Sequence, residues 1–473
     1  MGGLMWSAAA RIGAQAVQFG ITAVLARLLL PAEFGLVEMY AVFTGFAIVF
    51  VDLGLAAAIV QRKELEERHL SSAFWLNLAG GATVAGIIVA LAPAIAAFYG
   101  QPRLLLLTTV AAANFVIGAP GIVQSALLKR DLKFKRLAVV EGAATAVSGA
   151  VGISAAVAGA GVWSLVLLTL SSTAVRSLVL WFSTAWRPRW LIDRAAVRDL
   201  WKFSGNLLGF MSINYWAANA DNLLIGRFIG VGELGIYARA YNTMLLPLNQ
   251  ISGVTSSVMF PALSGIQDDR ERVKGAYLRA VRLVALVAFP ALVGLIVVAR
   301  PFILTAYGPH WLSAVPLLRA LCVAGLVQSS LMTSNWLYQS QGRTDWMFRW
   351  GMVLSVSTVV AFVVGVHWGA LGVTIAYAAV TVASAYPGIA IPGRLIDMTF
   401  TDVALTIYKS LVAATTMGAI VFVAGRAVPH DWPAGLELLL LIAVGIVSYA
   451  ASLRLLRANG YRDLVALRRD TRG

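Results

Sequence analysis

Charged residues are nearly absent from about fourteen separate stretches of this chain, each of roughly 20 or more mostly apolar residues. A helix needs roughly 20 residues to cross a hydrocarbon layer about 30 Å thick. We therefore expect an all-α membrane protein with about fourteen transmembrane helices. The expected spans are 4–30, 34–60, 72–98, 104–128, 137–158, 161–184, 203–225, 234–262, 277–305, 313–338, 348–366, 369–390, 405–426 and 434–456.

Composition supports a membrane protein and argues against two other classes. Charged residues make up 12% of the chain, against about 25% in soluble proteins. The net charge of +15 does not indicate nucleic-acid binding, because the basic residues lie at span ends rather than in one stripe. Cys322 is the one cysteine, so the chain forms no internal disulfide and no cysteine metal cluster.

Lysines and arginines gather in alternate loops, which predicts the orientation. The basic loops lie near 62–68, 129–136, 187–202 and 270–282, and the tail from 454 to 472 follows the same pattern. Since basic loops remain in the cytoplasm, both termini are expected there. The first span is too long for a signal peptide and has no basic segment before it, so we expect it to be retained.

Three connections between spans need separate interpretation. The pairs joined near Gly159–Gly161 and near His367–Gly369 have almost no loop, so a single kinked helix is the alternative at each. The longest cytoplasmic connection, 186–202, opens with two tryptophans and continues as an amphipathic stretch. It predicts an interfacial helix with its tryptophans at headgroup depth.

A weak internal duplication divides the chain. Three residues recur at a constant offset of 200: Arg27 with Arg227, Glu33 with Glu233, and Gly35 with Gly235. Spans 1–6 should then match spans 7–12 as two like-oriented lobes around a central cavity, with a substrate path near the midplane. The expected parts are an N-lobe at 1–185, an interfacial linker at 186–202, a C-lobe at 203–392, two further helices at 393–458 and a basic tail at 459–473.

Polar residues inside the spans are the candidates for function, because each costs several kcal/mol in lipid. The seventh span carries Asn214, Asn219 and Asp221, with the first and last on one helical face. This stripe either faces a wet cavity or forms hydrogen bonds between helices. The first span carries Arg11, Gln15 and Gln18 in a similar pattern, although Arg11 can instead reach the headgroups.

Four further arginines are candidates for the cavity. Arg27 and Arg227 lie at external helix ends, where they either anchor to headgroups or flank a central opening. Arg176 and Arg319 lie inside spans 6 and 10, and each can form a salt bridge, reach the surface or add positive potential to a lumen. Asp52, in the second span, either pairs with Arg11, binds a coupling cation or caps structure.

Catalytic signatures are lacking in the sequence. The four histidines fall in or beside different loops without metal-ligand spacing, so we expect no metal site. No GxxxxGK[ST] sequence is present, which argues against ATP as the direct energy source. We therefore expect a protein that is not an enzyme.

Several segments resemble one known family. They are Asp52–Leu55, Val60–Lys63, Phe74–Asn77, Phe260–Ser264, Gln267–Asp269, Tyr277–Ala280, Tyr307–Pro309 with Trp311, and Val315–Arg319. In their order and spacing they resemble the colanic-acid-exporter type of the polysaccharide transporter family, within the multidrug/oligosaccharidyl-lipid/polysaccharide flippase superfamily. The resemblance covers roughly 5–455.

The resemblance implies a flippase that moves an undecaprenyl-diphosphate-linked oligosaccharide across the bacterial inner membrane by alternating access. It implies a cationic lumen, for which span position suggests Arg11, Arg27, Arg176, Arg227 and Arg319. It implies no bound cofactor beyond a coupling H⁺ or Na⁺, for which Asp52 and Asp221 are the candidates. Membrane lipids, a polysaccharide polymerase and a chain-length regulator are the implied partners.

Two alternatives stay open. A cation-coupled drug exporter of the same superfamily would favour an acidic cavity, whereas the charges inside these spans are mainly positive. A membrane glycosyltransferase or polymerase usually carries its catalytic residues in a sizeable external loop, and the external loops here are short.

Overall fold

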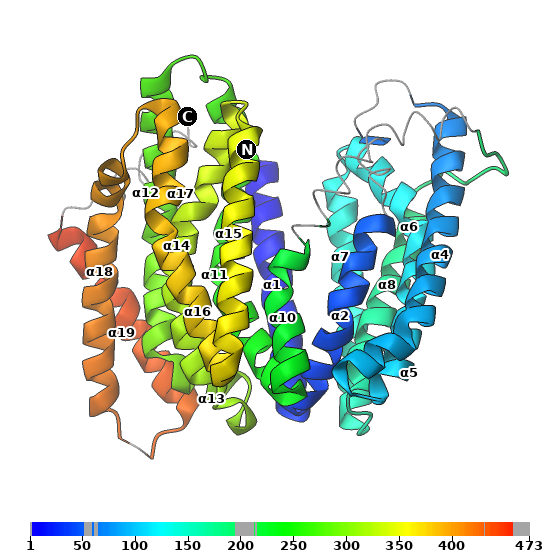
Figure 1. Ribbon diagram of the computed structural model, residues 1–473, viewed down its shortest axis with the longest axis horizontal. Helices are drawn as coiled ribbons and strands as arrows, with labels where there is room; N and C mark the ends of the chain where they lie inside the picture. The colour runs from blue at the N-terminus through cyan, green and yellow to red at the C-terminus, as the bar shows by residue number, and fades with distance from the viewer. Residues whose placement is uncertain are drawn as a thin grey trace. The chain divides into compact units, whose positions relative to one another are not determined.

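The computed structural model describes residues 2–51, 59–60, 65–193, 212, 215–429 and 431–456. The regular structure of these residues is helical, without strands (Figure 1). Nine helical runs in the described part are long and apolar enough to cross a membrane. The chain divides into two compact units, Met1–Gly235 and Ile236–Gly473.

The first unit contains most of the N-terminal helices. Its elements are α1 (Gly2–Leu28), α2 (Pro31–Val51), α4 (Glu67–Tyr99), α5 (Arg103–Ala111), α6 (Ala113–Arg130), α7 (Phe134–Val157), α8 (Trp163–Ser183), α10 (Ala220–Leu224) and the π-helical turn η1 (Ile225–Ile229). The first turn of α11 (Val231–Ser264) also belongs to it.

The second unit contains the rest of α11 and the remaining helices. They are α12 (Arg270–Val297), α13 (Ala299–Ala306), η2 (Pro309–Trp311), α14 (Ala314–Ser340), α15 (Thr344–Gly365), η3 (Val366–Trp368), α16 (Gly369–Ala383), α17 (Ala385–Gly393), η4 (Arg394–Ile396), α18 (Phe400–Ala427) and α19 (Ala434–Leu455). Every expected span except the seventh contains a long helix in the described residues, and 203–225 lies mostly outside them.

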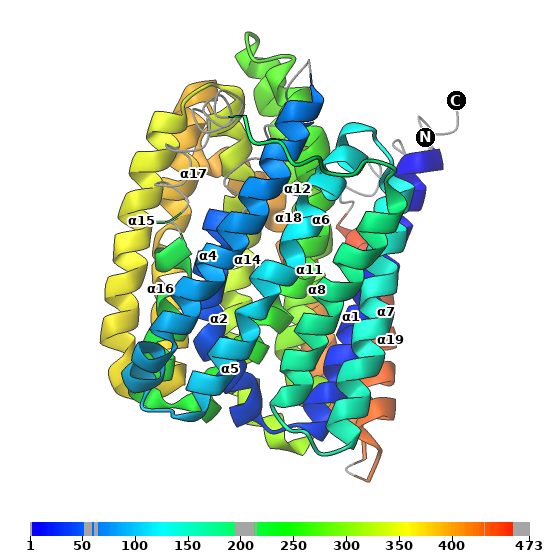
Figure 2. The same ribbon diagram turned by 90° about the vertical axis from the view of Figure 1, so that its right-hand side faces the viewer.

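Both connections with almost no loop are tight hairpins rather than kinks. Helices α7 and α8 run side by side (Figure 2), and a Cβ atom on Gly152 would lie 2.9 Å from the Leu168 side chain. Helices α15 and α16 likewise fold back, since a Cβ atom on Gly365 would lie 2.7 Å from the Gly372 carbonyl oxygen. At the second turn Gly369 has φ +73°, a conformation that favours glycine.

Among the expected spans other than the seventh, three are interrupted within the described residues. The ninth breaks at Val298, between α12 and α13, because the ring of Pro301 clashes with the carbonyl one turn earlier. The twelfth breaks at Ser384 for the same reason, three residues before Pro387. The fourth breaks at Ala112, where the Asn114 side chain donates a hydrogen bond to the backbone at Ala111.

Two glycines in equivalent positions of the duplicated motif pack against each other's helix starts within the first unit. Helices α2 and α11 begin at Pro31 and Val231, which preserves the offset of 200. A Cβ atom at Gly35 would overlap the carbonyl oxygen of Val231, and one at Gly235 would overlap that of Pro31. The contact is reciprocal, and each glycine directs an Hα at a carbonyl oxygen of the other helix.

Candidate functional site

An extended segment, Trp186–Asp193, lies along the first turns of α4. The expected interfacial helix is thus absent from 186–193, and 194–202 lie outside the described residues. Ser71 Oγ accepts a hydrogen bond from the Arg189 amide at 3.1 Å, and Trp75 Nε1 donates to the Arg189 carbonyl at 2.8 Å. These side-chain partners satisfy backbone groups that a helix would have paired internally, so the segment can remain extended.

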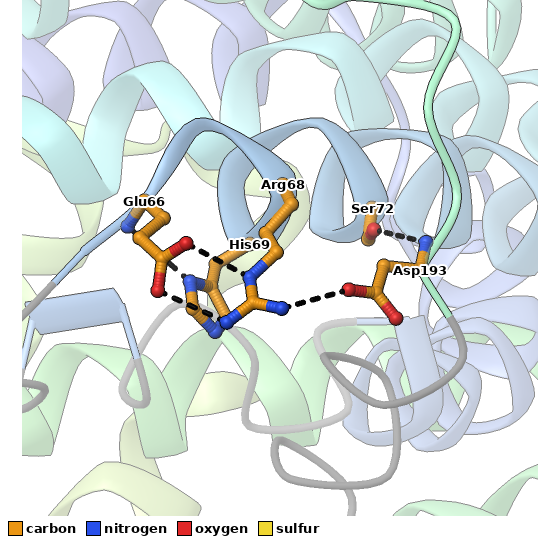
Figure 3. A network of polar contacts seen from close by, with 5 residues as sticks. All are labelled: Glu66, Arg68, His69, Ser72 and Asp193. Carbon is orange, nitrogen blue, oxygen red and sulfur yellow. Dashed lines mark hydrogen bonds and ion pairs between the residues drawn. The ribbon is translucent and has the colours of Figure 1, made fainter.

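Charged groups extend this attachment (Figure 3). Arg68 bonds Glu66 at 2.9 Å and reaches Asp193 at 3.3 Å, while the Asp193 amide donates to Ser72 Oγ at 2.8 Å. His69 is buried, and its Nδ1 accepts from the Glu66 amide at 3.2 Å. We call Trp186–Asp193 with its α4 partners the linker clasp, because it fastens the first part of the connection predicted between the lobes.

Trp75 should contribute most to the clasp, because its ring also stacks on Trp190 with centroids 4.0 Å apart. We expect Trp75→Ala to raise the rate of trypsin cleavage after Arg189 about tenfold, since a lost hydrogen bond and a lost aromatic contact together are worth about 1–3 kcal/mol. Cleavage is followed by mass spectrometry of the purified protein. Trp368→Ala, which removes an exposed tryptophan elsewhere, serves as the control, and equal cleavage of both variants would contradict the assignment.

The described part of the seventh span is packed through its aromatic and amide groups. Tyr215 Oη donates to the Val42 carbonyl at 2.8 Å, and Trp216 packs on Phe46. Asn219 Nδ2 donates to the Tyr215 carbonyl at 2.9 Å, and Asp221 is 5% exposed. Asn214 and Asp52 lie outside the described residues.

The two matched arginines differ in local backbone. Arg227 lies in the π-helical turn η1, and its exposed guanidinium lies over the Phe98 ring at 5.6 Å from the centroid. Arg27 is exposed in the last turn of the regular helix α1. π-Helical turns are rare in proteins, and those that occur are often found at functional sites. The turn therefore favours a functional role for Arg227.

Arg176 has an acidic partner that the sequence analysis missed. Its Nη2 bonds Glu141 Oε2 at 2.8 Å, joining α8 to α7. Glu141 is the one acidic residue in the span expected at 137–158, and this was the signal that could have identified it. On α1, Gln15 is partly buried and Gln18 is exposed, while the side chain of Arg11 lies outside the described residues.

A groove of about 1080 Å³ lies in the second unit between α12, α18 and α19. Its lining is mainly apolar and includes Pro290, Met417 and Ile446. Tyr449 fixes α19 to α12 through a 2.8 Å hydrogen bond to the Leu286 carbonyl oxygen. The groove is therefore built from the appended helix pair and one helix of the preceding repeat.

Two cationic side chains lie at one end of this groove. Both residues can be placed by their distance from the loop that joins α18 to α19. Along α18, Lys409 lies about 27 Å before the loop, and along α19, Arg454 lies about 30 Å after it. Because the two helices are joined by a short loop, the two residues lie at a similar level. Arg319 does not line the groove; its Nε donates to the Ile296 carbonyl at 3.1 Å and caps the end of α12.

Comparison with known proteins identifies the family. A family model described as polysaccharide biosynthesis protein matches residues 24–316, which is more than half of the chain. The chain belongs to this family of polysaccharide biosynthesis proteins. This confirms the resemblance seen in the sequence.

Individual relatives support this family assignment. The lipopolysaccharide biosynthesis protein WzxC of Escherichia coli is 31% identical over 79% of this chain and 77% of its own. The teichuronic acid biosynthesis protein TuaB of Bacillus subtilis is 28% identical over 95% and 94%, and the succinoglycan biosynthesis transport protein ExoT of Rhizobium meliloti is 25% identical over 98% and 94%.

Similarity to solved structures establishes the fold of this chain. The lipid II flippase MurJ, in an inward closed conformation, matches 96% of this chain and 98% of its own with a TM-score of 0.77 and 15% identity. An inward-facing multidrug transporter of the MATE family matches 80% and 94% with a TM-score of 0.66 and 17% identity. The likeness confirms the expected all-helical, multi-pass membrane fold.

Proposed function

We propose that this protein is a flippase that moves an undecaprenyl-diphosphate-linked oligosaccharide across the bacterial inner membrane for exopolysaccharide or lipopolysaccharide assembly. The names of its relatives refer to teichuronic acid, lipopolysaccharide and succinoglycan biosynthesis, and MurJ, which shares its fold, is named as a lipid II flippase. The protein acts without covalent chemistry. Both termini are cytoplasmic, as the distribution of lysine and arginine favours.

The observation that carries this proposal is the groove between α12, α18 and α19. Its apolar walls suit a polyprenyl tail, and Lys409 and Arg454 suit the anionic diphosphate at the head of that tail. The tail gains little hydrophobic free energy by leaving lipid for the groove, because both surroundings are apolar. The groove therefore positions the substrate, and the two cations distinguish it from neutral lipids.

Transport also requires an energy source. We propose coupling to H⁺ or Na⁺ through Asp52 or Asp221, since ATP-binding sequence is lacking. The polymerase and chain-length regulator that would use the flipped repeat unit are proposed partners on the same basis.

The direct test is reconstitution. Purified protein in vesicles should make a sugar-labelled lipid-linked oligosaccharide on the inner leaflet accessible to an added glycosidase. Protein-free vesicles are the control. Transport of organic cations by the same vesicles without any exposure of the oligosaccharide would instead favour the drug-exporter alternative.

Neutralising the groove's cations tests the site. We expect the Lys409→Gln, Arg454→Gln double variant to lower flipping at least tenfold, because each charge-assisted contact to phosphate is worth about 1.5–3 kcal/mol and a loss of about 1.4 kcal/mol already lowers a rate tenfold. Arg426→Gln, at the other end of α18, is the control. Equal flipping by the double variant and the control would show that the groove does not bind the head group.

A further inference from the structure

The Glu141–Arg176 ion pair lies inside the membrane-spanning part of the first unit. Glu141 is about 10 Å along α7 from its first residue, and Arg176 is about 10 Å from the last residue of α8. Charged side chains at such depth are costly and rare, and they mark sites that hold a partner or a substrate. The pair therefore requires a reason beyond joining two helices that already pack closely.

Both side chains lie on the packed sides of their helices. Glu141 precedes Ala144, Ser148 and Gly152 on the buried stripe of α7. On α8, the exposed apolar stripe contains Leu178, and Arg176 lies on nearly the opposite side, about 160° away. Neither charge therefore faces lipid.

Even so, the two side chains are far from buried. The Arg176 and Glu141 side chains are 44% and 53% exposed. On the inner side of each helix, away from its exposed apolar stripe, both charged groups are therefore accessible to water or a solute.

Helix α1 brings further polar groups to this level. The Ile21 side chain of α1 would overlap a Cβ atom at Gly149 of α7, so these two residues lie at one level along their helices. Three crossings, α2, α4 and the α5–α6 pair, lie between the two helices in the chain, which makes α1 and α7 parallel. Counting back eight residues along each places Gln15 within about one turn of the level of Glu141.

The ion pair leaves capacity for another anion. Arg176 makes one hydrogen bond to a described residue, although a guanidinium offers a fork of N–H donors. Such a fork matches phosphate oxygens as well as it matches a carboxylate. An incoming phosphate can thus approach Arg176 while Glu141 is still bound.

We propose that Glu141 is an internal counter-ion that occupies Arg176 until the diphosphate of the substrate replaces it. This inference rests on the proposed function, because it assigns to Arg176 and Glu141 one step in the transport of the same substrate, in addition to the contacts proposed for Lys409 and Arg454 in the groove. Without substrate, the carboxylate neutralises the guanidinium inside the membrane. When the diphosphate binds Arg176, Glu141 is released to the accessible inner side of the two helices, and it returns when the substrate leaves. Glu141 therefore lowers affinity and speeds release.

The test uses the purified full chain in phosphatidylcholine nanodiscs, titrated with farnesyl diphosphate and followed by calorimetry. Glu141→Gln should lower the dissociation constant about fivefold, and Arg176→Gln should raise it about tenfold. The double variant should behave like Arg176→Gln, because Glu141 acts only through the arginine. The exchange Glu141→Arg, Arg176→Glu keeps an ion pair and should remain folded while binding the diphosphate no more tightly than Arg176→Gln.

Controls separate the charge effect from other causes. Arg136→Gln removes a charge near the start of α7, where the guanidinium donates to the Ser183 carbonyl, and it should leave the affinity unchanged. Farnesol tests the prenyl tail alone and inorganic pyrophosphate tests a free phosphate; the proposal expects the variants to alter binding of farnesyl diphosphate and not of farnesol. An unchanged or higher dissociation constant for Glu141→Gln would overturn it.

The two proposals fail in different ways. The variants can change the affinity for farnesyl diphosphate as expected while vesicles flip no lipid-linked oligosaccharide. The proposed function is then wrong, and the counter-ion role of Glu141 still holds. If vesicles flip the oligosaccharide but Glu141→Gln binds farnesyl diphosphate no more tightly, the counter-ion proposal is wrong and the function remains.

Discussion

Gly235→Ala should reduce polysaccharide export at least tenfold, whereas Gly232→Ala, one turn earlier in the same helix, should leave export unchanged. A Cβ atom at Gly235 would overlap the carbonyl oxygen of Pro31 and lie 3.0 Å from the amide nitrogen of Gly35. Both obstacles are backbone atoms, which cannot rotate away as a side chain can. A Cβ atom at Gly232 meets nothing within 4 Å.

The expected cost of Gly235→Ala is that of overpacking, about 1–3 kcal/mol or more. A shift of the helix start that relieves the overlap would also displace η1 and Arg227, which directly precede α11. Export is measured by complementation of a strain without its flippase, and thermal unfolding of purified protein measures stability. Gly35→Ala should behave like Gly235→Ala, because the contact is reciprocal.

Equal export and equal unfolding temperatures for Gly232→Ala and Gly235→Ala would contradict the close contact. The comparison is well matched, because the two variants make the same chemical change one turn apart in the same helix. Any general benefit of alanine over glycine in a helix, about 1 kcal/mol, applies to both.

Ala450→Trp should nearly abolish flipping by filling the groove. Ala450 is exposed and lines the groove on α19, so an indole there occupies the space proposed for the polyprenyl tail without displacing core side chains. The substrate would then lose its positioning beside Lys409 and Arg454, and flipping should fall more than tenfold. Protein level and unfolding temperature should stay unchanged.

The neighbouring Ala451 provides the control. It is also an exposed alanine on α19 but does not line the groove, so Ala451→Trp should flip substrate normally. Flipping is measured with the glycosidase assay in vesicles. Normal activity of Ala450→Trp would show that the tail does not enter the groove, and equal loss in both variants would point to a general effect on α19.

The spans were predictable because their signal is strong and local. A long apolar stretch has few alternatives in lipid, and the tight turns at Gly159–Gly161 and Gly369 contain glycines that allow positive φ. The breaks at Val298 and Ser384 follow from prolines and were readable in the sequence, although the expected spans passed through them. The break at Ala112 has no comparable signal.

The site was less predictable because its parts come from separate helices. Arg176 was identified as an intramembrane charge, but its partner Glu141 lies one helix earlier, and the spacing of neither residue reveals the pairing. The linker clasp was expected to be helical because its composition is amphipathic. Its extended form depends on Ser71, Ser72 and Trp75, which are more than 100 residues away in the chain.

The π-helical turn makes the duplicated motif unequal in space. Compared with a regular helix, such a turn holds one additional residue, which rotates the residues before it by about 100° relative to those after it. Arg27 and Arg227 keep the same distance along the chain from Gly35 and Gly235, yet Arg27 lies in an α-helical turn and Arg227 in a π-helical one. The symmetry that the two copies of the motif share in sequence is thus broken in the backbone. Arg27 and Arg227 can therefore take different roles.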